Sequence, residues 1–350
     1  MATIAKYRPF TFMGTLLGVA WLSLISIARS QEGSWIRKTD MPTPRAGLYA
    51  SAVDGKIYAM GGHADQGMST IVEMYDPATD TWAPKAEMSS RRSRFTAGVV
   101  DGKIYVTGGE SPQGLPTAVE MYEPGIDTWT PRAEMPTPRT MLSSAVVDDK
   151  IYVIGGMAFN PDMTALSTVE MYDPATDTWT PKAEMPAPRW GLHTGVVDGK
   201  IYVIGGMIFD PDPVGVLTVD VYDPAADSWT TKAEMPAGRF MPVGGVVDGE
   251  IYCIGGPTEL YGAGAGSNVV ETYNPRTDAW TRKADMPTAR GFLSAATVDG
   301  KIYVIGGIQD LTAASFSTLE VFDPAAISTG VEGRSWGWLK TLIGHSLKRF

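Results

Sequence analysis

The chain has 350 residues, 44% of them hydrophobic, so it buries a large core and is not disordered along most of its length. An excess of 39 Asp and Glu over 29 Lys and Arg gives a formal net charge of −10, which argues against nucleic acid and anionic membranes as partners. Cys253 is the only cysteine, which excludes an intramolecular disulfide, and its place in an apolar strand pattern predicts a buried thiol.

The first thirty residues have the order of a secretory signal peptide. Lys6 and Arg8 precede an apolar run over residues 10–28, and the small residues Ala28 and Ser30 mark a cleavage site. We therefore expect this segment to be removed and the protein to be secreted or periplasmic. The alternative is an uncleaved membrane anchor, because the run approaches the roughly 20 residues that span a bilayer. A membrane is expected as a partner only in that second case.

One unit of about 50 residues occurs six times between Arg45 and Phe322. Each unit starts with an Arg that stands sixteen positions before a Gly-Gly pair, and five units continue with a Tyr seven positions before a Trp. The six arginines are Arg45, Arg92, Arg139, Arg189, Arg239 and Arg290. A repeat of this length indicates a radial fold in which each unit is one supersecondary structure.

Each unit predicts four short antiparallel strands. In the fourth unit, two β-prone runs flank the turn Asp198-Gly199, which is typical of a tight hairpin because Gly tolerates positive φ. In the third unit, residues 168–172 and 178–180 flank a Pro-containing turn and form a second hairpin. Tyr and Trp are expected to pack between adjacent sheets.

A Gly-Gly pair followed by a Tyr and a Trp at this spacing resembles the kelch repeat. The resemblance covers roughly residues 34–325 and implies an all-β propeller with four antiparallel strands per blade. Trp35 lies ten residues before Arg45, the interval found from Trp82 to Arg92, so an outer strand precedes the first complete unit. We expect six blades, with the strand around Trp35 pairing with residues 319–322 to close the ring.

These patterns divide the chain into three parts and predict a monomer. Residues 31–325 are the propeller and residues 326–350 are a tail. In the tail, Trp338, Leu342, Ile343 and Leu347 recur at helical spacing beside basic residues, which suggests a short amphipathic helix. Docking on the propeller, contact with a membrane surface and a role as a sorting tail all remain open.

Sequence diversity is concentrated on one face of the expected ring. The two positions after each Arg and the connections between second and third strands differ most, and alternate connections of a meandering sheet share one face. We expect exposed aromatic residues there, rimmed by Arg94, Glu110 and Glu259, to form a binding patch, and the alternative is that they pack within the loops. These aromatic residues are Trp190, Phe240, Phe292, Phe159 and Phe209.

The recurring arginines have two interpretations. In kelch proteins that bind acidic peptides, arginines near the blade junction reach the ligand, and the resemblance extends that role to these positions. Their presence in every blade instead favours an interblade hydrogen-bonding role for a group with five donors. The binding candidates are Arg45, Arg92, Arg139, Arg189, Arg239 and Arg290.

The leading functional hypothesis is an exported, noncatalytic recognition module for a protein or a glycan. The three histidines have no metal-ligand spacing, and the Asn160–Asp162 and Asp210–Asp212 segments are better explained as turns than as Ca²⁺ loops, so we expect no metal and no cofactor. The alternative is a sugar epimerase or mutarotase at the channel mouth. Its candidate catalytic residues are Glu259, Arg94, Glu110 and His193.

Overall fold

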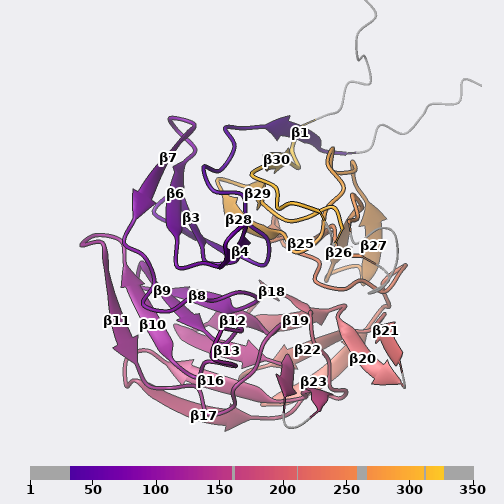
Figure 1. Cartoon of the computed structure of the whole chain (residues 1–350). Coiled ribbons are helices and arrows are strands. Elements are labelled where there is room, and N and C mark those ends of the chain that lie inside the picture. The colour runs from indigo at the N-terminus through magenta and orange to yellow at the C-terminus, as the bar shows by residue number, and fades with distance from the viewer. Residues whose placement is uncertain (1–31, 160–161, 211, 258–265, 311–312, 327–350) are drawn as a thin grey trace, which may run out of the picture.

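Six four-stranded antiparallel sheets form a closed ring in a computed structural model, as the sequence predicts (Figure 1). The structure describes residues 32–159, 162–210, 212–257, 266–310 and 313–326, and these contain strands and no helix. The predicted signal peptide, the tail and Glu259 lie outside the described residues, so the proposed boundaries stay predictions. No described helix is long and apolar enough to cross a membrane.

In every complete blade the innermost strand comes first in the chain. The first three blades are β2 (Tyr49–Val53), β3 (Lys56–Met60), β6 (Val72–Asp76) and β7 (Thr81–Lys85); β8 (Thr96–Val100), β9 (Lys103–Thr107), β10 (Val119–Glu123) and β11 (Thr128–Arg132); and β12 (Ser143–Val147), β13 (Lys150–Ile154), β16 (Val169–Asp173) and β17 (Thr178–Lys182). The fourth and fifth are β18 (His193–Val197), β19 (Lys200–Ile204), β22 (Val219–Asp223) and β23 (Ser228–Lys232); and β24 (Val246–Val247), β25 (Glu250–Ile254), β26 (Val270–Asn274) and β27 (Ala279–Arg282).

The sixth blade combines the two ends of the described chain. It contains β28 (Ser294–Val298), β29 (Lys301–Ile305), β30 (Leu319–Asp323) and the N-terminal strand β1 (Ser34–Arg37). Strand β1 pairs with β30 in antiparallel register, with Trp35 opposite Phe322. The predicted closure is therefore confirmed.

Three connections between second and third strands form two-stranded ribbons. They are β4 (His63–Ala64) with β5 (Gly67–Met68), β14 (Met157–Phe159) with β15 (Met163–Ala165), and β20 (Met207–Asp210) with β21 (Asp212–Gly215). The second and third ribbons belong to neighbouring blades, and β15 lies beside β20.

The hydrophobic core is divided among the interfaces between blades. One cluster joins Tyr152 and Val169 of the third blade to Leu192, Val203 and Tyr222 of the fourth. Cys253 is buried in the next such cluster, and loss of hydration raises the pKa of its thiol to about 12. The expectation of an inert, buried thiol is consistent with both observations.

The conserved spacing of Tyr, Trp and Asp within the units links each blade to the one before it. The Tyr172 hydroxyl donates a 2.5 Å hydrogen bond to Asp177, whose carboxylate accepts the Ala133 N–H of the preceding blade at 2.8 Å. Trp179 Nε1 donates to the Ala133 carbonyl at 3.0 Å. The aromatic residues therefore position polar groups across the blade interface as well as filling it.

The closing blade keeps this link with different atoms. Trp35 Nε1 donates to the Ala284 carbonyl at 2.9 Å, while the backbone carbonyl of Glu32 accepts the Ala284 N–H at 3.3 Å in place of an Asp carboxylate. Gly33 has φ +92°, and a Cβ there would lie 2.2 Å from the Phe322 ring. Only glycine allows the chain to cross this ring before β1 begins.

We predict that Trp35→Ala destabilises the whole ring. The substitution removes the bond to Ala284 and the contact with Phe322, whose ring centroid lies 5.0 Å away. Because Trp35 is half-buried, the loss is about 2–3 kcal/mol and the melting temperature falls by roughly 3–5 °C. Calorimetry measures both quantities. Ile36→Ala in the same strand is the control, because Ile36 is 50% exposed, and equal melting of the two variants would contradict the closure.

Candidate functional site

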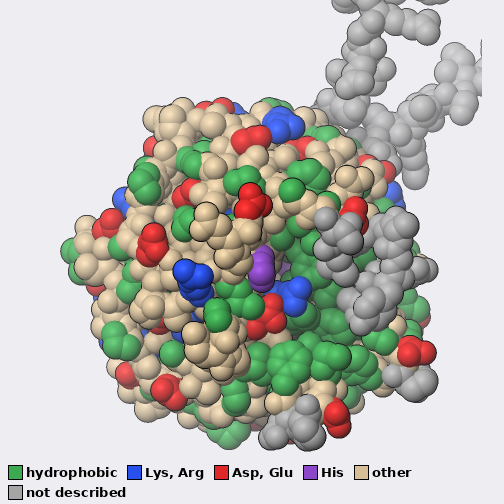
Figure 2. Space-filling model, in the orientation of Figure 1, with side chains coloured by type: hydrophobic (Ala, Val, Ile, Leu, Met, Phe, Trp, Pro, Cys, Tyr) green, Lys and Arg blue, Asp and Glu red, His purple; other side chains and the backbone are tan. Residues whose placement is uncertain are grey.

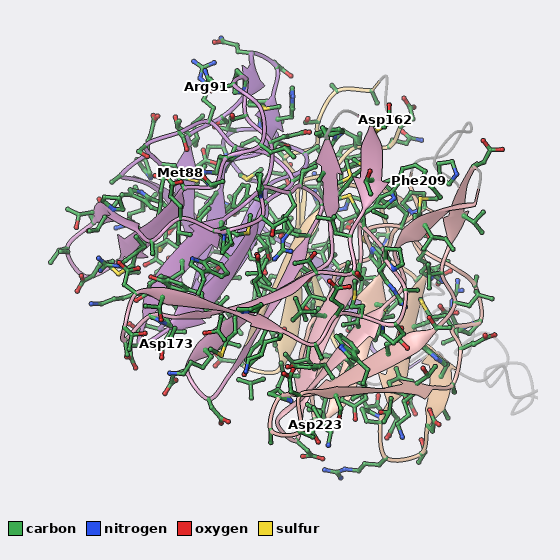
Figure 3. The ribbon with its side chains drawn as sticks, turned by 90° about the horizontal axis from the view of Figure 1, so that it is seen from below. Met88, Arg91, Asp162, Asp173, Phe209 and Asp223 are labelled. Atoms are coloured by element: carbon green, nitrogen blue, oxygen red, sulfur yellow. The ribbon has the colours of Figure 1, made fainter. Side chains whose placement is uncertain are left out.

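The variable connections lie on one face of the ring, here called the loop face. Figure 3 shows Arg91, Asp162 and Phe209 toward one side of the ring and Asp173 and Asp223 toward the other. The first three belong to connections that follow second or fourth strands, and the other two end third strands. At the centre of the molecule as seen along the ring axis, a hollow is bordered by a histidine, basic and acidic side chains (Figure 2).

All six repeat arginines are buried on the inner side of this face. Each guanidinium is at most 2% exposed and pairs with a carboxylate on the third strand of its own blade. The pairs are Arg45–Glu73 (2.7 Å), Arg92–Glu120 (2.8 Å), Arg139–Glu170 (3.0 Å), Arg189–Asp220, Arg239–Glu271 (2.7 Å) and Arg290–Glu320 (2.9 Å). These side chains therefore have almost no surface with which to meet a ligand.

Arg290 shows what the buried guanidinium does. It donates to the carbonyls of Gly306 (2.9 Å), Thr318 (2.8 Å) and Val304 (3.2 Å), at the point where the second and third strands separate. Burial lowers its pKa to about 10, with Glu320 opposing the shift, so the guanidinium keeps its charge at neutral pH. The side chain acts within one blade, and the expectation of interblade bonds from the arginine side chains was wrong.

The backbone of the same arginines does join the blades. The Arg92 carbonyl accepts the N–H of Gly62, the second glycine of the preceding blade, at 2.8 Å. Gly62 has φ +92°, and a Cβ there would lie 2.9 Å from the Ala46 carbonyl oxygen. The glycine pair is thus required by both backbone conformation and close approach.

A ring of left-handed residues surrounds the channel mouth, two positions after each Arg. Four are not glycine: Arg94 (φ 54°), Met141 (52°), Met241 (47°) and Phe292 (52°); the other two are Gly47 and Gly191. Five of these residues donate their N–H to the carbonyl of the equivalent residue in the preceding blade, at 2.7–3.0 Å. The bonds run from Gly47 to Phe292, from Arg94 to Gly47, from Met141 to Arg94, from Gly191 to Met141 and from Met241 to Gly191. Residue type varies at these six positions because backbone hydrogen bonds link them and do not depend on the side chain.

Beneath this ring the channel contains a cavity of about 160 Å³. Hydroxyls line it and are engaged in hydrogen bonds, as Ser143 is with Thr194 at 2.9 Å and Ser144 with Thr96 at 2.7 Å. His193 also lines the cavity, as expected, and its buried Nε2 has no hydrogen-bond partner. Loss of hydration lowers its pKa to about 4, despite a hydrogen bond to the backbone of Tyr252. The imidazole is therefore neutral at physiological pH.

The structure brings Arg94 and Glu110 together at the mouth. Their side chains form a 3.1 Å ion pair, and the Arg94 guanidinium lies 5.2 Å from the centre of the Phe292 ring. A second cavity of about 340 Å³ beside them is lined by His63 and Asp65 of the first blade. In the part of the chain described, no group of three or more His, Cys, Asp or Glu is placed to hold a metal ion.

Three of the five aromatic residues expected on the surface are buried. Trp190, Phe240 and Phe292 are 1–5% exposed and form one cluster with Met157 and Met207. The expectation that these three rings are exposed was wrong, and the alternative of packing within the loops describes them. Phe209, half-buried, stacks on Trp190 with 5.7 Å between centroids. The rings are buried because they pack against one another and against methionines of neighbouring blades.

The exposed apolar surface of the loop face lies instead on the two adjacent ribbons. Phe159 is 46% exposed, Met163 56%, Val214 47% and Leu217 38%, and these are four of the six large hydrophobic residues exposed among the described residues. Hydrophobic side chains gather over the part of the face that carries β20–β22 (Figure 2). We call these four residues the ribbon patch. Of these four residues, only Phe159 was expected on the surface from the sequence. The longer connections between second and third strands in these two blades also indicated where the exposed residues lie.

Comparison with known proteins matches every blade to a family model. The model described as Kelch motif matches residues 44–89, 91–136, 138–186, 189–236, 238–287 and 289–326. The Kelch-like protein terF of Aspergillus terreus is 36% identical over 87 residues, which are 23% of this chain and 19% of that protein. An F-box/kelch-repeat protein of Arabidopsis thaliana is 40% identical over 60 residues, 17% of this chain and 16% of that protein.

A solved structure shares the architecture. The structure of YjhT has a TM-score of 0.68 over 81% of this chain and 95% of its own, with 16% sequence identity. At this identity the likeness shows the fold alone. The chain matches less than a fifth of the length of the two curated relatives, so their activities and partners do not transfer to it.

We predict that Arg139→Ala lowers the free energy of unfolding by about 3–5 kcal/mol, because Glu170 is left buried without its partner. Urea denaturation measures the loss. The control is Arg37→Ala, whose exposed pair with Asp40 contributes less than about 1 kcal/mol. A destabilisation no larger than the control's would show that the buried pair is not structural.

We also predict a pH dependence of stability that belongs to His193. Its pKa is about 4 in the folded protein and about 6.5 when unfolded, so between these values only the unfolded chain binds the proton. Stability is complete above pH 6.5 and falls by up to about 3 kcal/mol as the pH drops toward 4. Urea midpoints across this range should fall less steeply in His193→Gln. Parallel profiles for the two proteins would contradict the lowered pKa.

Proposed function

The chain belongs to the kelch-repeat family, and we propose that it is a noncatalytic recognition module whose ribbon patch binds a protein partner. The observation that carries this proposal is the concentration of exposed apolar side chains on two neighbouring ribbons of one face. Surfaces of this kind on soluble proteins mark interaction sites. The apolar run over residues 10–28 supports the further proposal that the module is exported.

The base of each ribbon packs against buried residues. Phe159 pairs across its ribbon with Met163, and Met157 and Met207 at the base of the two ribbons are buried in the aromatic cluster around Trp190. A partner therefore meets side chains that are already positioned, and association costs less conformational entropy than binding to a free loop. A compact hydrophobic centre with a polar rim is the usual anatomy of such an interface.

A sugar-converting enzyme at the channel mouth is the second candidate. It is favoured by one observation, the cavity of about 160 Å³ that contains neutral His193 beneath the mouth residue Arg94. A neutral imidazole is able to accept a proton at physiological pH. Glu110, the described acid of the proposed set, is engaged by Arg94, and this engagement makes catalysis the weaker candidate.

We predict that Phe159→Ser combined with Met163→Ser weakens partner binding at least tenfold without changing the melting temperature. Buried apolar anchors at an interface centre typically contribute 1 kcal/mol or more each. The partner is identified by cross-linking in the source cell envelope, and its Kd is then measured with purified components. Ile126→Ser is the matched control, because Ile126 is 64% exposed in a turn on the opposite face and its loss should change Kd less than about twofold.

Two results would contradict this function. Equal loss of binding in Ile126→Ser would show that the ribbon patch is not the contact. Catalysed anomer exchange of a free sugar, followed by NMR and lost in both Glu110→Gln and His193→Gln, would establish the second candidate instead.

A further inference from the structure

We propose that residues 334–350 of this chain bind the ribbon patch, so that the surface offered to partners is also the docking site of the protein's own tail. This inference rests on the patch invoked in the proposed function and names one occupant for it. The occupant is the tail of the same copy.

The patch is apolar and its only charged neighbours in the chain are acidic. Between residues 157–168 and 207–218 the sequence holds Asp162, Asp210 and Asp212 and no Lys or Arg. Asp162 and Asp212 are exposed, beside Met163 and close to Val214 in the chain. A complementary partner segment therefore carries large apolar side chains together with several cations.

The tail has this composition. Residues 334–350 contain four cations and no Asp or Glu, together with two Trp and several large aliphatic residues. The cations are Arg334, Lys340, Lys348 and Arg349, and the apolar residues are Trp336, Trp338, Leu339, Leu342, Ile343, Leu347 and Phe350. Trp and cationic side chains together are what an acidic, apolar surface recognises.

The two ends of the chain are cationic, whereas the propeller between them is acidic. Residues 1–31 hold three cations and no acid, and residues 327–350 hold four cations and Glu332, a net +3 for each segment. Subtracting both from −10 leaves −16 for residues 32–326. A cationic segment is thus tethered to a strongly acidic body, and the attraction is screened by salt.

The tail is long enough to reach the patch. It departs from Ala326, whose carbonyl accepts the Gly33 N–H at 3.1 Å at the edge of the closing blade. Twenty-four residues extend to at most about 80 Å, whereas a body of some 295 residues is expected to be about 50 Å across. Attachment to the same chain replaces binding from solution by an intramolecular event, and the resulting effective concentration makes even weak docking significant.

Zero-length cross-linking of the full chain tests the proposal. A carbodiimide joins a Lys amine to an Asp carboxylate only where the two are in contact, and mass spectrometry locates the link. We expect Lys340 or Lys348 to be joined to Asp162 or Asp212, with yields at least fivefold lower in 0.5 M salt. Links within one chain support the proposal, whereas links confined to a dimer band overturn it, because the tail then comes from a second copy.

Matched variants separate docking from random encounter. The links should be lost in Phe159→Ser combined with Met163→Ser and retained in Ile126→Ser. Links that persist in the ribbon variant, or that spread over acids of the opposite face such as Asp173 and Asp223, overturn the proposal. Tail-dependent binding to phosphatidylglycerol vesicles without any ribbon link also overturns it, because the occupant of the tail is then a lipid surface.

The same variants keep this inference distinct from the proposed function. If Trp336→Ser with Trp338→Ser leaves partner binding intact and no ribbon link forms in the unaltered chain, the tail inference fails and the recognition surface stands. If the links form as expected but no partner protein depends on Phe159 and Met163, the tail is the occupant and the recognition function fails.

Discussion

The buried arginine–carboxylate pair is the constraint on which the ring depends. In each blade the guanidinium sits where the second and third strands separate, so it supplies donors to carbonyls that leave the sheet there, such as those of Gly61 and Ile71 beside Arg45. At five of the six junctions its backbone carbonyl accepts the N–H of the second glycine of the preceding blade, and the Arg290 carbonyl instead accepts the Ser267 N–H. One residue therefore fixes the exit of a loop and the junction between two blades. Because that exit is fixed, the loop beyond it is free to change in length and composition without disturbing the propeller.

The parts of the fold that sequence predicts are those that rest on such fixed separations. The interval of sixteen residues separates Arg45 from Gly61, whose carbonyl its Nη1 binds. Trp35 is recognisable because the Trp of each outer strand donates to a backbone carbonyl of the preceding blade. Blade number and closure follow from counting these intervals. Burial of the loop aromatic residues does not follow from the intervals. The repeat fixes the position of Trp190 or Phe240 in a blade, but it does not specify which side chains pack against them. Phe292 is an example, because its positive φ changes the direction of the side chain and the hydrophobic pattern of the sequence does not predict that change.

The two faces of the ring differ because side chains link the blades on one face and backbone groups link them on the other. Asp177 and its equivalents lie in the turns between third and fourth strands, where they tie each blade to its neighbour, so these turns repeat almost unchanged. On the loop face the blades are linked by backbone hydrogen bonds, which involve the arginine carbonyls and the left-handed residues at the mouth. Backbone bonds place few demands on side-chain identity. Diversity therefore accumulates on the loop face for a physical reason, and its presence there is expected whether or not the protein has a ligand.

What distinguishes a functional surface from mere tolerance of variation is organisation beyond what the ring requires. Trp190 contacts Phe240 edge to face at 4.7 Å between centroids, and Phe240 contacts Phe292 at 5.8 Å, so a continuous aromatic chain crosses three blades. Propeller closure does not need this chain, because the other three blades place Gly47, Ser93 and Thr140 at or next to the equivalent positions. Its effect is to hold Phe209 and the base of the neighbouring ribbons, leaving Met163 and Val214 projecting from a rigid support. Burying aromatic residues to present a few exposed aliphatic ones lowers the entropy lost on association. The buried rings therefore support the proposed recognition surface, whose contact residues are those of the ribbon patch.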